Sequence, residues 1–527
     1  MSSLSANLVA STTNPNGSIP PKNDVRVRDS FFKSVQWSAD GTTLFTSSFS
    51  NRICTFVLPE SLLEPRSSPV ELVPHSTLAL PEPTSAIAPC PYFALEHPST
   101  QTFLTASTDH PIHLHHAFPP SPPSPSTSIT HGADNDGDDV DIDDGFRHHH
   151  HHLLLQPPPL ASFRLIKHET EAYLPIASLL WPAPGTHFIA GTTNRIALFD
   201  VSRPDSLVPD PLLTIPTIPS TRHLAKGGGV GMRGTVSALA AQPSGEDGSG
   251  WGLLAAGTWT RNLGLYDLVR SGECVATWSV ADAAREAGIG GRGIMQTAWS
   301  PCGRYLVVNE RGAKGLLVYD LRGTHRLLGT LEGRDGTTNQ RLSCDVFPGS
   351  EGAGGFEVWA GTKKGGVVVW QGVGNQEGAV KPSWDWEAHD SAVGATAMHL
   401  SGSVMATCSG AWTFVDDEDD DDSSDSSSSS DSRSSGSGSD SNGSRGGSGS
   451  DGDDDSEDDA DDSGSDNSSG SPSVSSSEES LSPVRRGNLK TRVVIRETSL
   501  KIWSLGTTQS SPLGRETRGS DDGESYP

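Results

Sequence analysis

The sequence lacks the features that mark several protein classes. It has no apolar run of the roughly 20 residues that a membrane-spanning helix needs. Its N-terminus has no basic start followed by an apolar core, so we expect no secretory signal there. The six cysteines are scattered without the CxxC spacing of zinc sites, which favours a reducing compartment over a disulfide framework. Apolar residues make up only 33% of the chain, so we expect part of it to be disordered.

Motifs for catalysis are also missing. There is no P-loop, no HExxH and no nucleophile elbow, so we expect no enzyme, no catalytic residues and no cofactor. Residues 229–234 fit GxGxxG formally, but a short strand follows where a dinucleotide site needs a helix, which favours a flexible loop. The five consecutive histidines at 148–152 offer no fixed ligand geometry. We therefore interpret them as a compositional repeat and predict no metal site.

Negative charge is concentrated in two segments. Residues 134–144 carry seven acids and no base, and residues 416–479 carry 22 acids against two arginines. Together they account for the whole net charge of −27. The rest of the chain is neutral, so its surface can still hold a basic patch.

The chain contains a repeated strand–turn–strand–turn–strand unit. Its cleanest copy is at 294–321, which reads IMQTAWSPCG, RYLVVNE, RGAKG and LLVYDL. Several copies end in an aromatic–Asp pair, and a less regular outer strand follows some of them. This pattern predicts an all-β fold, a seven-bladed WD-repeat β-propeller with two long disordered acidic insertions. The other copies are at 37–57, 86–118, 180–200, 236–268, 341–370 and, in two pieces, 393–414 and 499–505.

The repeats set the predicted domain boundaries. We expect a flexible N-terminal arm at 1–25, a propeller at 26–505 and a disordered C-terminal tail at 506–527. Insertions rich in Pro, Ser, Asp and Gly interrupt the propeller at 119–158 and 416–488. The second insertion is predicted to lie inside the last blade, because KIWSL at 501–505 has the pattern of a third strand.

Basic residues recur in two classes of loop that share one face of a propeller. These are the loops after each second strand and the loops that lead into the next blade. Arginine makes bidentate contacts with phosphate and stacks on bases, and the nearby Trp259 and Trp412 are suited to stacking on unpaired bases. The alternative to a binding function is that these basic residues are ordinary solvated charges of exposed loops. The candidate RNA-binding residues are Arg52, Arg195, Arg233, Arg261, Arg292, Lys314, Arg341, Lys363 and Lys364.

Several stretches resemble one known family. FFKSVQWSADG at 31–41, DHPIHLHHAF at 109–118 and TTNQR at 337–341 are similar, in order, to signatures of the telomerase Cajal body protein family of WD-repeat proteins and its fungal splicing-associated relatives. His115 and His116 stand where that family has Trp and Asp, and the acidic tract is longer than expected for it.

The resemblance implies an RNA-binding scaffold that assembles or guides small nuclear ribonucleoproteins. The implied partners are small nuclear RNA or telomerase RNA and their RNP proteins. The implied location is the nucleus (Cajal body-like or nucleoplasmic), with the cytoplasm as a second location. We expect a monomer with no membrane partner and no small-molecule substrate. The alternative is a protein-only WD-repeat scaffold that binds peptides or basic proteins. The acidic tract is then a solubilising loop, a docking tract for basic partners, or a competitor for the basic face.

Overall fold

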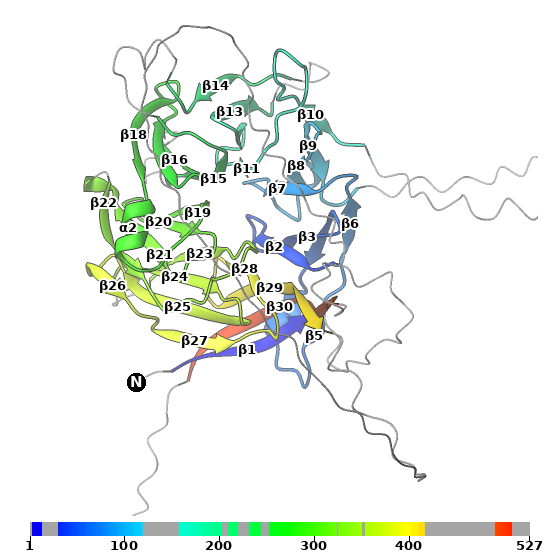
Figure 1. The fold of residues 1–527 in the computed structure, drawn as a ribbon. Coiled ribbons are helices and arrows are strands. Elements are labelled where there is room, and N and C mark those ends of the chain that lie inside the picture. Colours follow the sequence, from blue (N-terminus) through cyan, green and yellow to red (C-terminus); the bar gives the residue numbers. More distant parts are fainter. Residues whose placement is uncertain are drawn as a thin grey trace, which may run out of the picture. The chain divides into compact units, whose positions relative to one another are not determined.

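The computed structural model describes residues 3–12, 30–119, 158–202, 209–219, 231–243, 252–323, 325–349, 354–416 and 491–508. The chain divides into two compact units, residues 1–413 with 495–527 and residues 414–494. The first unit is almost entirely β-structure, in seven sheets that form the blades of a ring (Figure 1). The predicted seven-bladed propeller is therefore confirmed. The predicted disorder of the insertions and of the C-terminal tail concerns segments that lie almost wholly outside the described residues.

The first strand of each blade lines the centre of the ring, and the second strand pairs with it on its outer side. The innermost strands are β2 (Phe32–Trp37), β7 (Thr84–Pro89), β11 (Ser178–Leu180), β15 (Val236–Ala241), β19 (Ile294–Trp299), β23 (Cys344–Pro348) and β28 (Val393–Met398). The second strands are β3 (Thr43–Ser48), β8 (Thr102–Ser107), β12 (His187–Thr192), β16 (Leu253–Thr258), β20 (Tyr305–Glu310), β24 (Phe356–Gly361) and β29 (Val404–Asp416). We number the blades 1 to 7 in this order.

The third and fourth strands complete each blade outward. The third strands are β4 (Arg52–Val57), β9 (Ile112–His116), β13 (Arg195–Asp200), β17 (Asn262–Asp267), β21 (Leu316–Asp320), β25 (Gly366–Val373) and β30 (Thr491–Thr508). The outer strands are β6 (Ser76–Ala79), β10 (Ala161–Phe163), β14 (Leu213–Pro216), β18 (Glu273–Ser279), β22 (Arg326–Leu331), β27 (Trp384–Glu387) and β1 (Ser3–Ser11).

Short elements fill the connections. Blade 5 gains a fifth strand, β26 (Gly378–Val380), and blade 7 gains β5 (Val70–Glu71), each parallel to the outer strand. The described helices are α2 (Ala281–Glu286) and the 3-10 turns η1 (Glu60–Leu63), η2 (Pro98–Thr100) and η4 (Leu321–Gly323). No helix in the described ranges is long and apolar enough to span a membrane.

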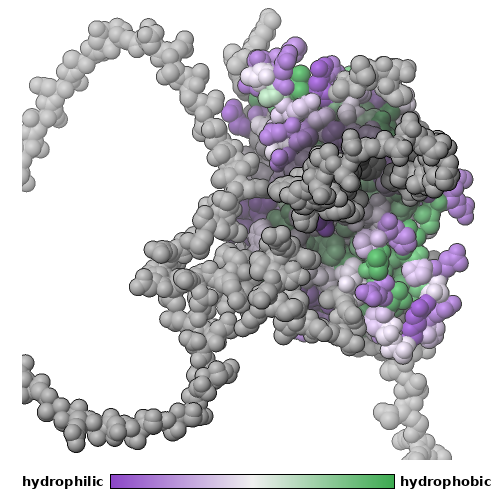
Figure 2. Space-filling view, turned by 90° about the vertical axis from the view of Figure 1, so that its right-hand side faces the viewer, coloured by the Kyte–Doolittle hydropathy of each residue, from purple (hydrophilic) through white to green (hydrophobic). Residues whose placement is uncertain are grey.

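Apolar side chains pack between neighbouring blades. The central strands carry them on both faces, as in β3 and β8, where every residue is buried. Phe188 and Phe199 stack at 4.8 Å between ring centroids, and Phe163 of blade 2 packs edge-on against them. In the side view of Figure 2, hydrophobic residues show mainly in the recessed middle of the described surface. The ring is thus held by sheet-to-sheet burial, as the strand patterns predict.

Polar links tie the blades together near the centre. The Trp37 indole donates to the Ala397 carbonyl across the junction of blades 1 and 7, at 2.9 Å. The Trp299 indole makes the equivalent contact with Ala240 of blade 4, at 3.1 Å. The tryptophan that opens the best repeats therefore fixes one blade against the preceding one.

The N-terminus differs from the prediction. Residues 1–25 were expected to be a flexible arm, but Ser3–Ser11 form β1, the outer strand of blade 7, antiparallel to β30. Residues 13–29 lie outside the described part of the chain. The physical reason for the correction is ring closure: the last blade needs an outer strand, and pairing with β1 covers the exposed edge of β30.

Blade 7 is assembled from distant segments. Its strands are ordered β28-β29-β30-β1, so the chain leaves at the end of β29 and returns at β30 after the acidic insertion. This confirms that KIWSL supplies a third strand inside the last blade. The strand extends to Thr508, three residues beyond the predicted end of the propeller.

Candidate nucleic-acid interface

Strand direction defines one face of the ring, which we call the loop face. In each blade the turn between the second and third strands lies at the same end as the connection from the outer strand to the next blade. All nine candidate RNA-binding residues lie at this end. Arg195 and Arg261 are half-buried, and the other seven are exposed. Although Arg341 is exposed as a residue, its guanidinium lies in the central channel against the carbonyls of Ser237 and Met295. The structure therefore gathers on one face what the sequence spreads over 313 positions, from Arg52 to Lys364.

Positive charge on the loop face is concentrated over blades 4 to 6. In the described loops at 231–235, 259–262, 280–293, 311–315, 332–343 and 362–365, bases outnumber acids by ten to four, which makes this sector basic. The bases are Arg233, Arg261, Arg285, Arg292, Arg311, Lys314, Arg334, Arg341, Lys363 and Lys364, and the acids are Asp282, Glu286, Glu332 and Asp335.

The connection from blade 5 to blade 6, residues 332–343, makes hydrogen bonds to several blades of this sector. Within it the buried Arg334 donates to the Gly361 carbonyl at 2.9 Å, to Asn309 Oδ1 at 2.9 Å and to the Leu342 carbonyl at 2.7 Å. Burial lowers the pKa of Arg334 to about 10. All three of these hydrogen-bond partners are neutral, so this arginine holds blades 5 and 6 together and is unavailable to a ligand.

The TTNQR segment at 337–341 lies at the channel and touches blades on both of its sides. Gln340 Nε2 donates to the Gly410 carbonyl of blade 7 at 2.7 Å. Arg341 donates to the carbonyls of Ser237 in blade 4, at 3.2 Å, and of Met295 in blade 5. The segment therefore spans from blade 4 to blade 7, and Arg341 braces two blades as well as facing the solvent of the channel.

Three arginines cluster on the loop face beside that segment. Arg292 donates to Asn339 Oδ1 at 3.1 Å, and its side chain lies over Gly312, next to Arg311. Burial and the positive charge of Arg311 lower the pKa of Arg341 to about 10; burial and Arg292 lower that of Arg311. Among the described residues none of the three makes an ion pair with a carboxylate. The cluster therefore carries mutually repelling charge that an anion would relieve.

Unlike the three arginines of this cluster, Arg261 is paired with a carboxylate of the protein. Its guanidinium forms a bidentate ion pair with Glu310, at 2.7 and 3.0 Å. The Glu310 side chain is only 2% exposed, so the pair ties the turn of blade 4 to blade 5. Burial raises the pKa of Glu310, against the opposing effect of Arg261. Much of the charge of Arg261 is thus already compensated within the protein.

Two partly exposed tryptophans lie on the loop face. Trp259, in the turn between β16 and β17, is 51% exposed, and the Arg311 guanidinium lies over its ring at 5.7 Å from the centroid. Trp412, near the end of β29, is 39% exposed and packs against Phe31 and Phe49, at 5.3 and 4.7 Å. Trp259 therefore offers a free aromatic surface next to cations, whereas Trp412 is part of an aromatic cluster.

The innermost strands line a central channel of about 530 Å³. Most of its polar lining consists of Ser, Thr and Gln side chains. The charged residues among its lining are Lys33, Arg341 and Asp345. Burial raises the pKa of Asp345 to about 6, although two backbone N–H groups donate to its carboxylate. The channel is thus polar, with positive charge at the mouth that opens on the loop face.

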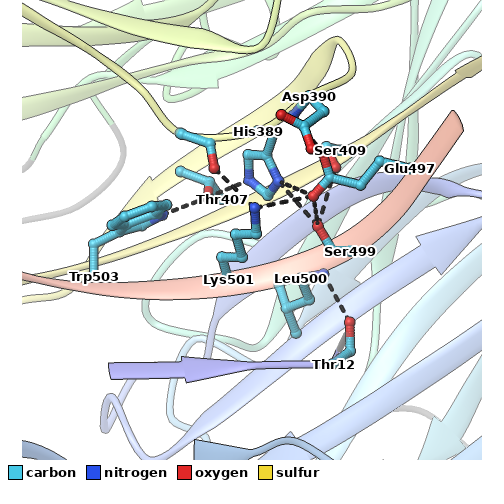
Figure 3. Close-up of polar contacts among 11 residues, drawn as sticks. Thr12, His389, Asp390, Thr407, Ser409, Glu497, Ser499, Leu500, Lys501 and Trp503 are labelled. Atoms are coloured by element: carbon cyan, nitrogen blue, oxygen red, sulfur yellow. Dashed lines mark hydrogen bonds and ion pairs between the residues drawn. The ribbon is translucent and has the colours of Figure 1, made fainter. Parts of the chain in front are cut away.

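Blade 7 contains a buried polar network that no local sequence pattern signals (Figure 3). His389 Nε2 lies 2.7 Å from Thr407 Oγ1, which accepts the Trp503 indole proton at 2.8 Å. A hydroxyl that accepts the indole proton can donate its own to Nε2. We therefore assign the imidazole proton to Nδ1, which faces Glu497 Oε1 at 3.2 Å. Lys501 pairs with the same carboxylate at 3.0 Å.

This network fixes the two halves of a split blade. Thr407 precedes the acidic insertion, whereas Glu497 and Trp503 follow it. Burial lowers the pKa of His389. Burial alone would raise the pKa of Glu497, but hydrogen bonds with His389 and Ser499 outweigh it and hold that pKa far below its usual range. Neutral imidazole and ionised carboxylate are thus the native states.

No constellation for metal binding occurs in the ranges that the structure describes. All six cysteines are free thiols. His115, on β9, contacts both His113 and Phe103, at 5.7 Å between ring centroids in each pair. Burial lowers the pKa of His115 to about 4, so this pair packs as neutral side chains. The five-histidine run at 148–152 lies outside the described residues.

The chain is similar to a protein of known name. The chain is 23% identical over 344 residues to a protein of the fission yeast Schizosaccharomyces pombe that is named guanine nucleotide-binding protein negative regulator 1. The matched region covers 65% of this chain and 70% of that protein. No family model matches the chain. The relative's name describes a regulator.

Proposed function

We propose that this propeller is an RNA-binding scaffold whose loop face, over blades 4 to 6, holds a small nuclear RNA during assembly of a ribonucleoprotein. One observation carries the proposal: Arg292, Arg311 and Arg341 cluster there without a carboxylate partner among the described residues, beside an exposed tryptophan. Clustered cations with an aromatic surface suit phosphates and unpaired bases together.

The chemistry of the face supports a polyanion over a neutral partner. Exposed lysines and arginines that repel one another gain free energy when phosphates replace water and counterions around them. The loops are fixed by hydrogen bonds to four blades, so a ligand would meet a preformed surface. The same loops carry the TTNQR segment, which resembles a signature of the telomerase Cajal body protein family.

Crosslinking in cells followed by sequencing tests this proposal. We expect small structured nuclear RNAs to be enriched with the wild-type protein. A variant with Arg292, Lys363 and Lys364 replaced by Ala should lose that enrichment. RNA recovery at the level of a non-crosslinked control would overturn the proposal.

A protein-only scaffold is the second candidate, and the fission yeast relative favours it. That relative's name connects it with a guanine nucleotide-binding protein. On this reading, the basic loop face binds an acidic surface of a protein partner. Enrichment of a GTP-binding protein, without RNA and insensitive to ribonuclease, would support this candidate against the first.

A further inference from the structure

We infer that Trp259 is the stacking platform for one unpaired base of the RNA, and that Arg292, Arg311 and Arg341 hold the phosphates next to that base. The inference rests on the proposed function and assigns a recognition site within it. It concerns a single-stranded nucleotide, because the bases of a duplex are already stacked on one another and present no free face to an indole.

The first step is the exposure of Trp259. Half of its surface is open to solvent, and no other aromatic ring among the described residues packs against it. Trp412, on the same face, instead contacts two phenylalanines, which explains its position by packing alone. An indole left open on a polar face has apolar area available for a ligand.

The second step is rigidity. The Trp259 backbone N–H donates to the Thr235 carbonyl at 3.2 Å. Gly293, which has a φ of +148°, packs so closely that an added Cβ would lie 2.8 Å from the Trp259 carbonyl oxygen. Thr235 lies in the connection that leads into blade 4, and Gly293 lies in the connection that leads from blade 4 into blade 5. The backbone of Trp259 is therefore held from two sides, so little backbone entropy is lost when a base stacks on the indole.

The third step is charge. The Arg311 guanidinium lies over the Trp259 ring, and Arg292 lies over Gly312 beside it. Arg341 adds a third positive charge: its guanidinium is held by the carbonyls of Ser237 and Met295, and Met295 lies two residues after Gly293, which packs against Trp259. A nucleotide stacked on Trp259 would therefore place its flanking phosphates among three cations that lack a carboxylate partner within the described structure.

Two fluorescein-labelled probes with equal numbers of phosphates test the assignment: a ten-nucleotide oligoadenylate and an abasic ribose-phosphate decamer. Fluorescence anisotropy measures the affinity of each. Trp259→Ala should weaken oligoadenylate binding by roughly tenfold, as expected for the loss of one base–aromatic stack, and leave abasic binding unchanged. Trp259→Phe should retain most of the affinity, and Arg292→Ala should weaken both probes to the same extent.

Val275→Ala is the matched control, because Val275 is 54% exposed on outer strand β18, away from the loop face. Trp259→Ala that binds oligoadenylate as wild type does, or that weakens both probes equally, overturns the stacking role and leaves RNA binding intact. A wild-type protein that binds neither probe overturns the proposed function itself, and tight binding of a phosphoserine peptide in their place would identify a protein ligand.

Discussion

Two polar clusters in this ring differ in whether the protein satisfies them. In blade 7, His389, Thr407, Glu497 and Trp503 find their partners in one another. On the loop face, three arginines find only carbonyl and amide oxygens and an aromatic ring. Buried polar groups that are hydrogen-bonded to one another stabilise a specific fold. Accessible charges of the same sign that lack a partner instead favour the binding of a ligand of opposite charge.

Breaking the satisfied cluster should have the largest effect. His389→Ala removes the partner of two buried groups, so we expect the free energy of unfolding to fall by about 2–4 kcal/mol. Urea unfolding followed by fluorescence measures it. RNA affinity of the folded protein should stay unchanged. His97→Ala, at an exposed histidine on the opposite face, is the control and should have no effect. Equal stability of both variants would contradict the role given to the network.

Arg341 combines the two roles, because it holds two blades together through hydrogen bonds and also belongs to the arginine cluster on the loop face. Arg341→Ala should cost about 1–2 kcal/mol of stability through the lost contacts with Ser237 and Met295. It should also weaken RNA binding, since it removes one charge of the cluster. Thermal melts and binding titrations on the same preparation separate the two effects. A melt identical to that of wild type would mean that the brace contributes nothing.

Acid should weaken blade 7. The pKa values of His389 and Glu497 both lie below their unfolded values, so their contributions are full above about pH 6.5 and are lost as the pH falls. For His389 the loss begins below about pH 6.5, by at most about 1.4 kcal/mol per pH unit. Unfolding titrations at pH 7.5 and 5.5 check this in wild type and in His389→Gln. An equal decline in both would assign the effect to other groups.

How far the sequence predicts this structure depends on how local the signal is. The strands of blade 5 follow from one continuous repeat at 294–321, with Trp299 and the turn after it. Strand β1 was missed because its partner, β30, lies at the other end of the chain, and nothing near Ser3–Ser11 signals that pairing.

The candidate site shows the same limit. The position of a loop within a blade predicts on which face of the ring its basic residues lie. The nine candidate residues could therefore be assigned to one face from the sequence. Local sequence does not predict that Arg261 is paired with Glu310, 49 positions away, or that Arg334 is buried. No local pattern signals the network around His389, because the acidic insertion separates His389 from Glu497 by 108 positions and Thr407 from Trp503 by 96.

Removing the acidic insertion should have a small effect on stability. Residues 417–490 join β29 to β30, two hydrogen-bonded neighbours, so a short glycine–serine turn can replace them. We expect a cooperative melt within a few degrees of wild type. If the tract competes for the basic face, RNA affinity should rise at low salt and converge with wild type at high salt. Unchanged affinity at every salt concentration would eliminate the competitor idea.

The most direct test of the account is the salt dependence of RNA affinity in a variant with Arg292, Lys363 and Lys364 replaced by Ala. These side chains are exposed, so stability should stay within about 0.5 kcal/mol of wild type. The slope of log affinity against log salt should flatten by roughly 0.7 per lost contact. The control replaces Arg66, Arg270 and Arg304, exposed on the opposite face, and should keep the wild-type slope. Equal slopes and affinities in both triple variants would contradict a loop-face RNA site.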